Sequence, residues 1–395
     1  MQALATIAIS PEFASRRWVV GQGGQEPEGA PGGRTKVNGQ VQRAPVQHAP
    51  RLMETPAMLT ISASRNFSQR APIHHFMSLP RAVVPGRIYM VQRRCSERRF
   101  FLRPGAVTNQ AVWYCLAVAL QKTGVALLAA MAMSNHVHVV IHDVHGQLPK
   151  FLHLFHLLLA RSQNCYLGRW EAFWASEQTS CVELVHDDDV LDKCAYALAN
   201  PVAADLVETA AEWPGASSWA AMAGARRLVA TRPTHFFSTK MPAAVDLPLH
   251  GLASMNMDDF VAAVRARVHA IEATTRRARV QAGRRCLGRK AVLTQSFFAR
   301  PPSHAPRRNL APRVACRSKW HRIERLAQNK AWQHAYAAAR LAWLAGHSVA
   351  FPEGTWALRH LTVSHATAAP GGRPPTSGAS PASQRREHHN RGPAH

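Results

Sequence analysis

In the segment "HVHVVIH", residues 136–142, the histidines occupy every second position except 140, with aliphatic residues between them, and this pattern restricts the fold more than any other feature. In a β-strand, successive side chains point to opposite faces. One face of the segment therefore carries His136, His138 and His142 together with Val140, and the other carries Val137, Val139 and Ile141. The pattern predicts a strand with two adjacent histidines on one face, entered through a turn at Ser134 and Asn135.

Two neighbouring imidazoles on a rigid strand are able to hold one divalent metal ion. A buried histidine is more often a hydrogen-bonded core residue, and a chain with 22 histidines also produces His-x-His by chance. His142 lies on the same strand face as the pair. It is therefore a further metal ligand, a residue that contacts a ligand, or a solvent-facing bystander with no role at the metal. The pattern alone leaves a metal site and an ordinary core as open alternatives.

The apolar periodicity of the surrounding segments predicts an α+β fold. Strands are expected at 87–94, 125–133, 136–142 and 179–185, and helices at 108–122, 148–169 and 187–200. This order of elements is the ferredoxin-like pattern, an antiparallel sheet with helices on one face. Three aspartates at 187–189 favour a helix N-terminus, and Pro201 is expected to end that helix.

Composition divides the chain into five parts. Residues 1–76 and 363–395 are rich in Gly, Pro, Ser, Gln and Arg without lasting periodicity, so both termini are expected to be disordered. Met77 is a candidate start of translation. A globular domain is expected at 77–220 and a linker at 221–256. Residues 257–362 are expected to form a basic, mainly helical region, with helices at 257–282 and 319–345.

The charge balance indicates a polyanionic partner. The formal net charge is +25, and 261–330 holds 18 Lys and Arg against two acidic residues, a composition suited to contacting phosphates. Nucleic acid is the first candidate partner. A membrane surface is the second, and it is weakened because the charges follow no sustained amphipathic helix and no apolar run could span a bilayer.

Cysteine usage argues against a disulfide framework and a zinc ribbon. The seven cysteines are scattered, odd in number and never arranged as Cys-x-x-Cys.

The N-terminal segment does not resemble a secretion signal, because the chain opens without a basic start followed by a sustained apolar core. It is therefore expected to be cytoplasmic, and nucleoid-associated in a bacterial cell.

A third ligand and a nucleophile are suggested by the segment "DKCAYALANPV". Tyr196 and Asn200 are four residues apart on the predicted helix and so share a face. At this spacing, the phenol of Tyr196 and the amide oxygen of Asn200 could both reach a metal ion held by the two histidines. The alternative is that Tyr196 packs in the core and Asn200 lies at the helix end before Pro201. Asp192, four residues before Tyr196, either orients the phenol or favours the helix N-terminus.

Four segments in order carry a resemblance to a known family: "PGRIYMVQRR", "MSNHVHVVI", "YALANPVAADLV" and "WPGASSW". Over 79–219 the chain resembles the single-tyrosine HUH transposases, in the branch of REP-associated tyrosine transposases. The resemblance implies that His136, His138 and Asn200 are ligands of Mg²⁺ or Mn²⁺ and that Tyr196 is the nucleophile. Ser134 stands where the family usually has proline, and the basic C-terminal half has no counterpart in minimal members.

The implied reaction is cleavage and rejoining of single-stranded DNA through a 5′-phosphotyrosine, on hairpins formed by palindromic repeats. Arg93, Arg94, Arg98 and Arg99 are candidates to contact the DNA backbone beside the site, although exposed arginine clusters are more often merely solvated. Zinc is a third choice of metal. The chain is expected to act as a monomer or a homodimer.

Two rival functions remain open from the sequence. A non-catalytic nucleic-acid-binding protein, domesticated from a transposase, would keep the fold and the charge. A metal-dependent hydrolase could also use His-x-His, but the amidohydrolase barrels that do so need repeated strand-helix units, and the chain lacks that repeat.

Overall fold

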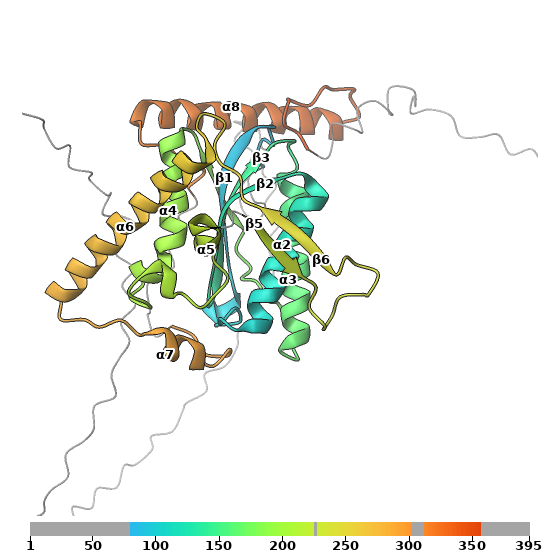
Figure 1. Cartoon of the computed structure of the whole chain (residues 1–395). Coiled ribbons are helices and arrows are strands. Elements are labelled where there is room, and N and C mark those ends of the chain that lie inside the picture. Colours follow the sequence, from blue (N-terminus) through green and yellow to red (C-terminus); the bar gives the residue numbers. More distant parts are fainter. Residues whose placement is uncertain (1–79, 225–226, 302–311, 357–395) are drawn as a thin grey trace, which may run out of the picture.

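The computed structural model describes residues 80–224, 227–301 and 312–356 (Figure 1). The predicted disordered termini, at 1–76 and 363–395, and the candidate start at Met77 lie outside these ranges. No helix within the described ranges carries an apolar stretch long enough to cross a lipid bilayer.

A five-stranded sheet forms the centre of the molecule, in the order β2-β3-β1-β4-β7. Its strands are β1 (Arg87–Arg94), β2 (Ala126–Met133), β3 (His136–Asp143), β4 (Ser180–Leu184) and β7 (Val314–Ala315). The pairs β2–β3, β3–β1 and β1–β4 are antiparallel, whereas β7 runs parallel to β4. The α+β class is confirmed. The sheet is mixed rather than purely antiparallel, because the basic C-terminal region adds a short strand at one edge.

Helices cover both faces of the sheet, which corrects the prediction of helices on one face. Figure 1 shows α2 (Ala106–Thr123) and α3 (Leu148–Tyr166) on one side. On the other side, α4 (Asp187–Ala203) packs on β2 and β3, and α6 (Met257–Gln281) packs on α4. The reason is that β2 and β3 are buried along nearly their whole lengths, so neither face can be left to water.

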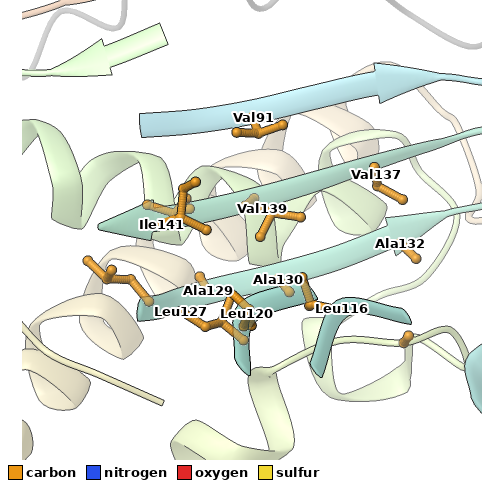
Figure 2. Close-up of a cluster of buried hydrophobic side chains, with 14 of the residues drawn as sticks. Val91, Leu116, Leu120, Leu127, Ala129, Ala130, Ala132, Val137, Val139 and Ile141 are labelled. Atoms are coloured by element: carbon orange, nitrogen blue, oxygen red, sulfur yellow. The ribbon is translucent and has the colours of Figure 1, made fainter. Parts of the chain in front are cut away.

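The alternation predicted for the histidine strand is present in β3. Figure 2 shows Val137, Val139 and Ile141 packed beside β2 and β1, in a buried cluster that includes Leu116 and Leu120 of α2. Burial of an aliphatic side chain of this size contributes about 1.5–3 kcal/mol. The opposite parity directs the histidines toward the face that α4 covers.

The segment 213–219, "WPGASSW", covers the outer edge of β2. The backbone N–H of Ala132 donates to the carbonyl of Ala216 at 2.8 Å, and that of Ser218 donates to the carbonyl of Ala130 at 2.9 Å. The indole N–H of Trp213 donates to the carbonyl of Ala132 at 3.0 Å. An uncovered edge strand would leave these backbone groups unpaired, so the segment completes the sheet. It follows the short 3-10 helix η2 (Ala210–Glu212) and ends on the first residue of the short helix α5 (Trp219–Ala223).

Replacing Gly215 with alanine is expected to lower the free energy of unfolding by about 1–3 kcal/mol, because it overpacks this edge. A Cβ at Gly215 would lie 2.9 Å from the carbonyl oxygen of Ala132 and even closer to the Trp213 indole nitrogen, a ring held by its own hydrogen bond. Urea denaturation measures the change. Gly105→Ala is the matched control, since a Cβ there meets nothing within 4 Å. Equal denaturation midpoints for the two variants would contradict the prediction.

The segment 221–256, expected to be a linker, contains an antiparallel hairpin. Its strands are β5 (Arg227–Thr231) and β6 (Ala244–Pro248). The hairpin packs on α2: the Tyr114 hydroxyl donates to the carbonyl of Pro242 at 2.7 Å, and the Tyr114 ring lies 4.9 Å from that of Phe237. The prediction of a linker is therefore wrong for this segment, because two aromatic residues anchor it to the core.

The basic C-terminal region lies against the rest of the chain. Besides α6 it contains α7 (Arg289–Thr294) and α8 (Lys319–Leu344). Arg267 of α6 forms ion pairs with Asp188 and Asp192 of α4, at 2.7 and 3.2 Å. The division into a domain at 77–220 and a separate module from 257 stays a prediction about independent folding.

Candidate active site

His136 and His138 lie side by side on β3, between β1 and β2. In register, His136 faces Arg94 of β1, and His138 faces Gln92. The centroids of the two imidazole rings are 4.6 Å apart, and His138 is fully buried. A strand with neighbours on both sides is among the most rigid supports in a fold, so the two rings are held in a constant relation.

Asn135 orients the first of these rings, a role that the sequence analysis did not assign. Its side-chain N–H donates to the carbonyl of Arg98 at 3.1 Å, so its amide oxygen faces Nδ1 of His136, at 2.7 Å. An acceptor at this position holds the proton on Nδ1 and leaves the Nε2 lone pair available. The Asn–His dipeptide was the signal in the sequence, but it was interpreted only as a turn.

Helix α4 brings Tyr196 to the histidine pair. The Tyr196 ring lies 5.8 Å from that of His138, centroid to centroid, and the two rings are perpendicular. Asn200 lies one turn further along the same helix and is partly buried. The helix continues through Pro201 to Ala203, beyond the predicted end, and Val202 in this last turn is fully buried against Met131 and Met133.

Lys193 is a further residue of the site that the sequence analysis missed. Its Nζ lies 5.4 Å from the centroid of the Tyr196 ring, three residues along α4. Burial lowers the pKa of this ammonium, while Asp192 and Asp189 act in the opposite direction. An i,i+3 spacing on a helix was the available signal. Asp192 forms ion pairs with Arg267 and Arg317.

Both histidines are held neutral. Burial is the largest cause that lowers the pKa of each, and for His138 it brings the pKa to about 3, with contributions from Arg94 and Lys193. Within the described residues, neither ring nitrogen of His138 has a hydrogen-bond partner. An unpaired buried polar group costs about 1–3 kcal/mol. Neutral imidazoles with unused lone pairs fit the requirements of a metal ligand.

The lowered histidine pKa values predict a loss of stability in mild acid. His156 of α3, on the other face of the sheet, also has its pKa lowered to about 3, by burial first and then by Arg93. Between pH 6.5 and pH 3, this histidine is protonated in the unfolded chain but stays neutral in the folded chain. Each such histidine therefore lowers the free energy of unfolding by about 1.4 kcal/mol per pH unit as the pH falls from 6.5 toward 3.

Urea denaturation at pH 6.5 and pH 5 in the presence of EDTA measures this slope. His156→Gln is expected to reduce the slope by about 1.4 kcal/mol per pH unit. Wild-type and variant proteins with the same slope would contradict the assignment of a depressed pKa to His156.

The four candidate DNA-contacting arginines are not equivalent. Arg94 lies on the histidine face, whereas Arg93 has the opposite parity and its Nη1 lies 3.0 Å from Nδ1 of His156. Arg93 therefore contacts His156 on the other face of the sheet and does not lie beside His136 and His138. Arg98 belongs to the 3-10 helix η1 (Ser96–Arg98). The Arg99 guanidinium, next in the chain, donates to Glu97 and to the carbonyl of Phe298.

His142 does not belong to the same site. It shares the face of His138, but it lies four residues further along β3, a separation of about 13 Å at the usual rise per strand residue. One metal ion cannot bridge that distance, since metal–nitrogen bonds are about 2 Å long. The structure therefore favours the bystander among the alternatives left open for His142.

Comparison with known proteins adds two distant similarities. No family model matches the chain, and no curated protein matches it. A solved structure of a REP-associated tyrosine transposase bound to a REP hairpin is 13% identical, with a TM-score of 0.31, over 36% of this chain and 82% of that chain. A structure from Deinococcus radiodurans R1, assigned as a transposase, is 16% identical, with a TM-score of 0.22, over 27% and 85% of the respective chains. Neither similarity is high enough to establish a family.

Proposed function

We propose that this chain is a metal-dependent DNA transposase, a nuclease and strand transferase that uses Tyr196 as its nucleophile. The observation that carries the proposal is the convergence of three side chains from two separate elements. His136 and His138 come from β3, Tyr196 comes from α4, and the ring contacts join all three in one cluster. A phenol beside two neutral histidines is a combination suited to attack on a phosphodiester.

His136, His138 and Asn200 would hold the metal, Mg²⁺ or Mn²⁺, with Zn²⁺ as a third choice. The unpartnered nitrogens of His138 and the Nδ1–H tautomer of His136 both fit this use. An amide oxygen from Asn200 would give the mixed nitrogen and oxygen set that Mn²⁺ accepts. When bound, such an ion polarises the phosphate and neutralises the charge that develops on it.

Tyr196 would attack the phosphorus atom of a DNA phosphodiester through its hydroxyl oxygen. The new bond joins this oxygen to phosphorus, and the bond from phosphorus to the 3′ oxygen breaks. The phenol proton leaves to solvent, and the 3′ oxygen takes a proton to become a free hydroxyl. Attack by the 3′ hydroxyl of a second strand reverses the step and rejoins DNA. The phosphodiester is conserved throughout, so no other energy source is required.

Lys193 would assist the nucleophile. A phenol has a reference pKa near 10 and is a weak nucleophile at neutral pH. A positive charge near the ring favours the phenolate.

Single-stranded DNA, in hairpins of palindromic repeats, is the proposed partner. A net charge of +25 supports a polyanion, and Arg94 lies on the same face as the two histidines. The nucleophile requires a phosphate that is exposed and free to align with Tyr196, which a flexible single strand supplies more readily than a duplex. The protein is proposed to act as a monomer or a homodimer.

Removal of divalent metal is expected to abolish the covalent reaction. The full chain is incubated with labelled hairpin DNA from the flanks of its own gene, with Mn²⁺ or Mg²⁺, and scored for a protein–DNA adduct that survives denaturation. The adduct is expected with either ion and is expected to disappear with EDTA, because the neutral histidines then hold no ion at the phosphate. An adduct of equal yield in EDTA would contradict the metal dependence.

The same assay tests the alternative of a non-catalytic, domesticated DNA-binding protein. Hairpin binding that is tight and specific, without an adduct at any metal concentration, would establish that alternative. The basic C-terminal region supplies charge for such binding whether or not the tyrosine reacts.

A further inference from the structure

Three potential metal ligands meet at a second place, away from β3. His186 immediately precedes α4, Cys316 immediately follows β7, and His321 lies in the first turn of α8. Their ligand atoms all lie within 4.8 Å of one another, and Nε2 of His186 is 2.9 Å from Nδ1 of His321. Cys316 is buried, and both histidines are exposed. Each residue comes from a different segment of the chain, so their convergence is a product of the tertiary structure.

We propose that His186, Cys316 and His321 form a zinc site. A thiolate with two imidazoles is a ligand set that suits Zn²⁺, whereas Mg²⁺ prefers oxygen ligands. Bonds of about 2.0–2.3 Å in a tetrahedral site hold ligand atoms roughly 3.3–3.8 Å apart. The observed spacing needs only small side-chain movements to reach this geometry, and water would complete the coordination.

Asp189 holds the segments that carry these ligands. Its carboxylate accepts a hydrogen bond from the backbone N–H of His186 at 3.1 Å and another from that of Arg317 at 2.8 Å. It thus fixes the residue before α4 against the residue after Cys316, and it is itself buried. The Arg317 guanidinium pairs with Asp192, which strengthens the same junction. A backbone fixed in this way positions the ligands before any ion arrives.

Zinc bound here would connect the C-terminal region to the start of the helix that carries Tyr196. β7 pairs with β4 through only two residues, so the attachment of this region to the sheet is short. A metal bridge between the start of α4 and the start of α8 would stabilise that attachment. The inference is independent of the proposed reaction, since it uses none of the β3 histidines.

Titration with Co²⁺, which replaces Zn²⁺ and has visible spectra, tests the proposal on the full chain without a polyhistidine tag. A thiolate ligand produces a sulfur-to-cobalt charge-transfer band in the near ultraviolet, and none of the ligands proposed for the β3 site is a thiol. We expect this band at one equivalent of Co²⁺ and expect Zn²⁺ to displace it. We also expect Zn²⁺ to raise the Tm of the protein.

The variants Cys316→Ser and His321→Gln are expected to lose the band and the zinc-dependent rise in Tm. His321 is exposed, so its replacement tests the site without disturbing the core. The control Cys286→Ser, at a cysteine outside this group, is expected to retain both signals. Absence of the band from the wild-type protein, or a band that survives Cys316→Ser, would overturn the proposal and leave a hydrogen-bonded histidine pair beside a buried thiol.

Discussion

Tyr196→Phe is expected to eliminate the covalent protein–DNA adduct completely, while hairpin binding stays unchanged. The substitution removes only the hydroxyl oxygen that would form the bond to phosphorus. The ring that packs edge-on against His138 remains, so the site keeps its shape. DNA affinity is expected to persist because it depends on basic side chains that contact phosphates. The measurements are adduct yield after denaturation and hairpin affinity at one fixed salt concentration.

Tyr166→Phe is the matched control, since Tyr166 is 40% exposed on α3 and lies outside the candidate site. This variant should form the adduct at the wild-type level. Formation of the adduct by Tyr196→Phe would show that another residue is the nucleophile. A simultaneous loss of hairpin binding would instead show that the substitution disturbs the structure of the site.

His138→Gln is expected to slow adduct formation at least about 100-fold. Loss of a group that merely orients a ligand typically costs about 10–100-fold, and loss of the ligand itself should cost no less. The effect should be partly relieved by raising the concentration of Mn²⁺, because the variant retains His136 and Asn200 as ligands. Initial rates of adduct formation as a function of Mn²⁺ concentration measure both effects.

His156→Gln separates this loss from a general loss of stability. His156 is also buried, and its pKa is also lowered to about 3, but it lies on α3 and contacts Arg93. Both variants replace a buried imidazole, so a loss of activity caused by destabilisation alone should appear in both. Only His138→Gln should change the metal dependence. Equal rates for the two variants would contradict the role assigned to His138.

Local patterns explain how much of the site could be predicted from the sequence. The faces of β3 follow from the period of two, which places His136 and His138 together and separates them from Val137 and Val139. The four-residue spacing of Tyr196 and Asn200 follows from the helix repeat in the same way. The encounter of His138 with Tyr196 was expected only through the resemblance, because the two residues lie 58 positions apart and no local rule brings them together.

The misjudged features all depend on distant contacts. Arg93 and Arg94 are adjacent in the sequence, yet only the packing of α3 and α4 decides which of them meets buried aromatic residues and which meets the histidines. The hairpin of β5 and β6 is anchored by Tyr114, more than 100 residues earlier. The short β7 strand becomes visible only when β4 supplies its hydrogen-bond partners.

The sequence by itself determined the character of each element: a strand with a histidine face, a helix with a tyrosine, and a strongly basic C-terminal half. These properties depend on periodicity and charge within short stretches. Only the tertiary structure decided which faces meet. It placed α4 over the histidine face, added β7 to the sheet, and brought His186 together with Cys316 and His321. The physical reason is that these contacts form when apolar faces of distant segments are buried against one another. The pattern within one segment does not determine which other segment will cover its apolar face.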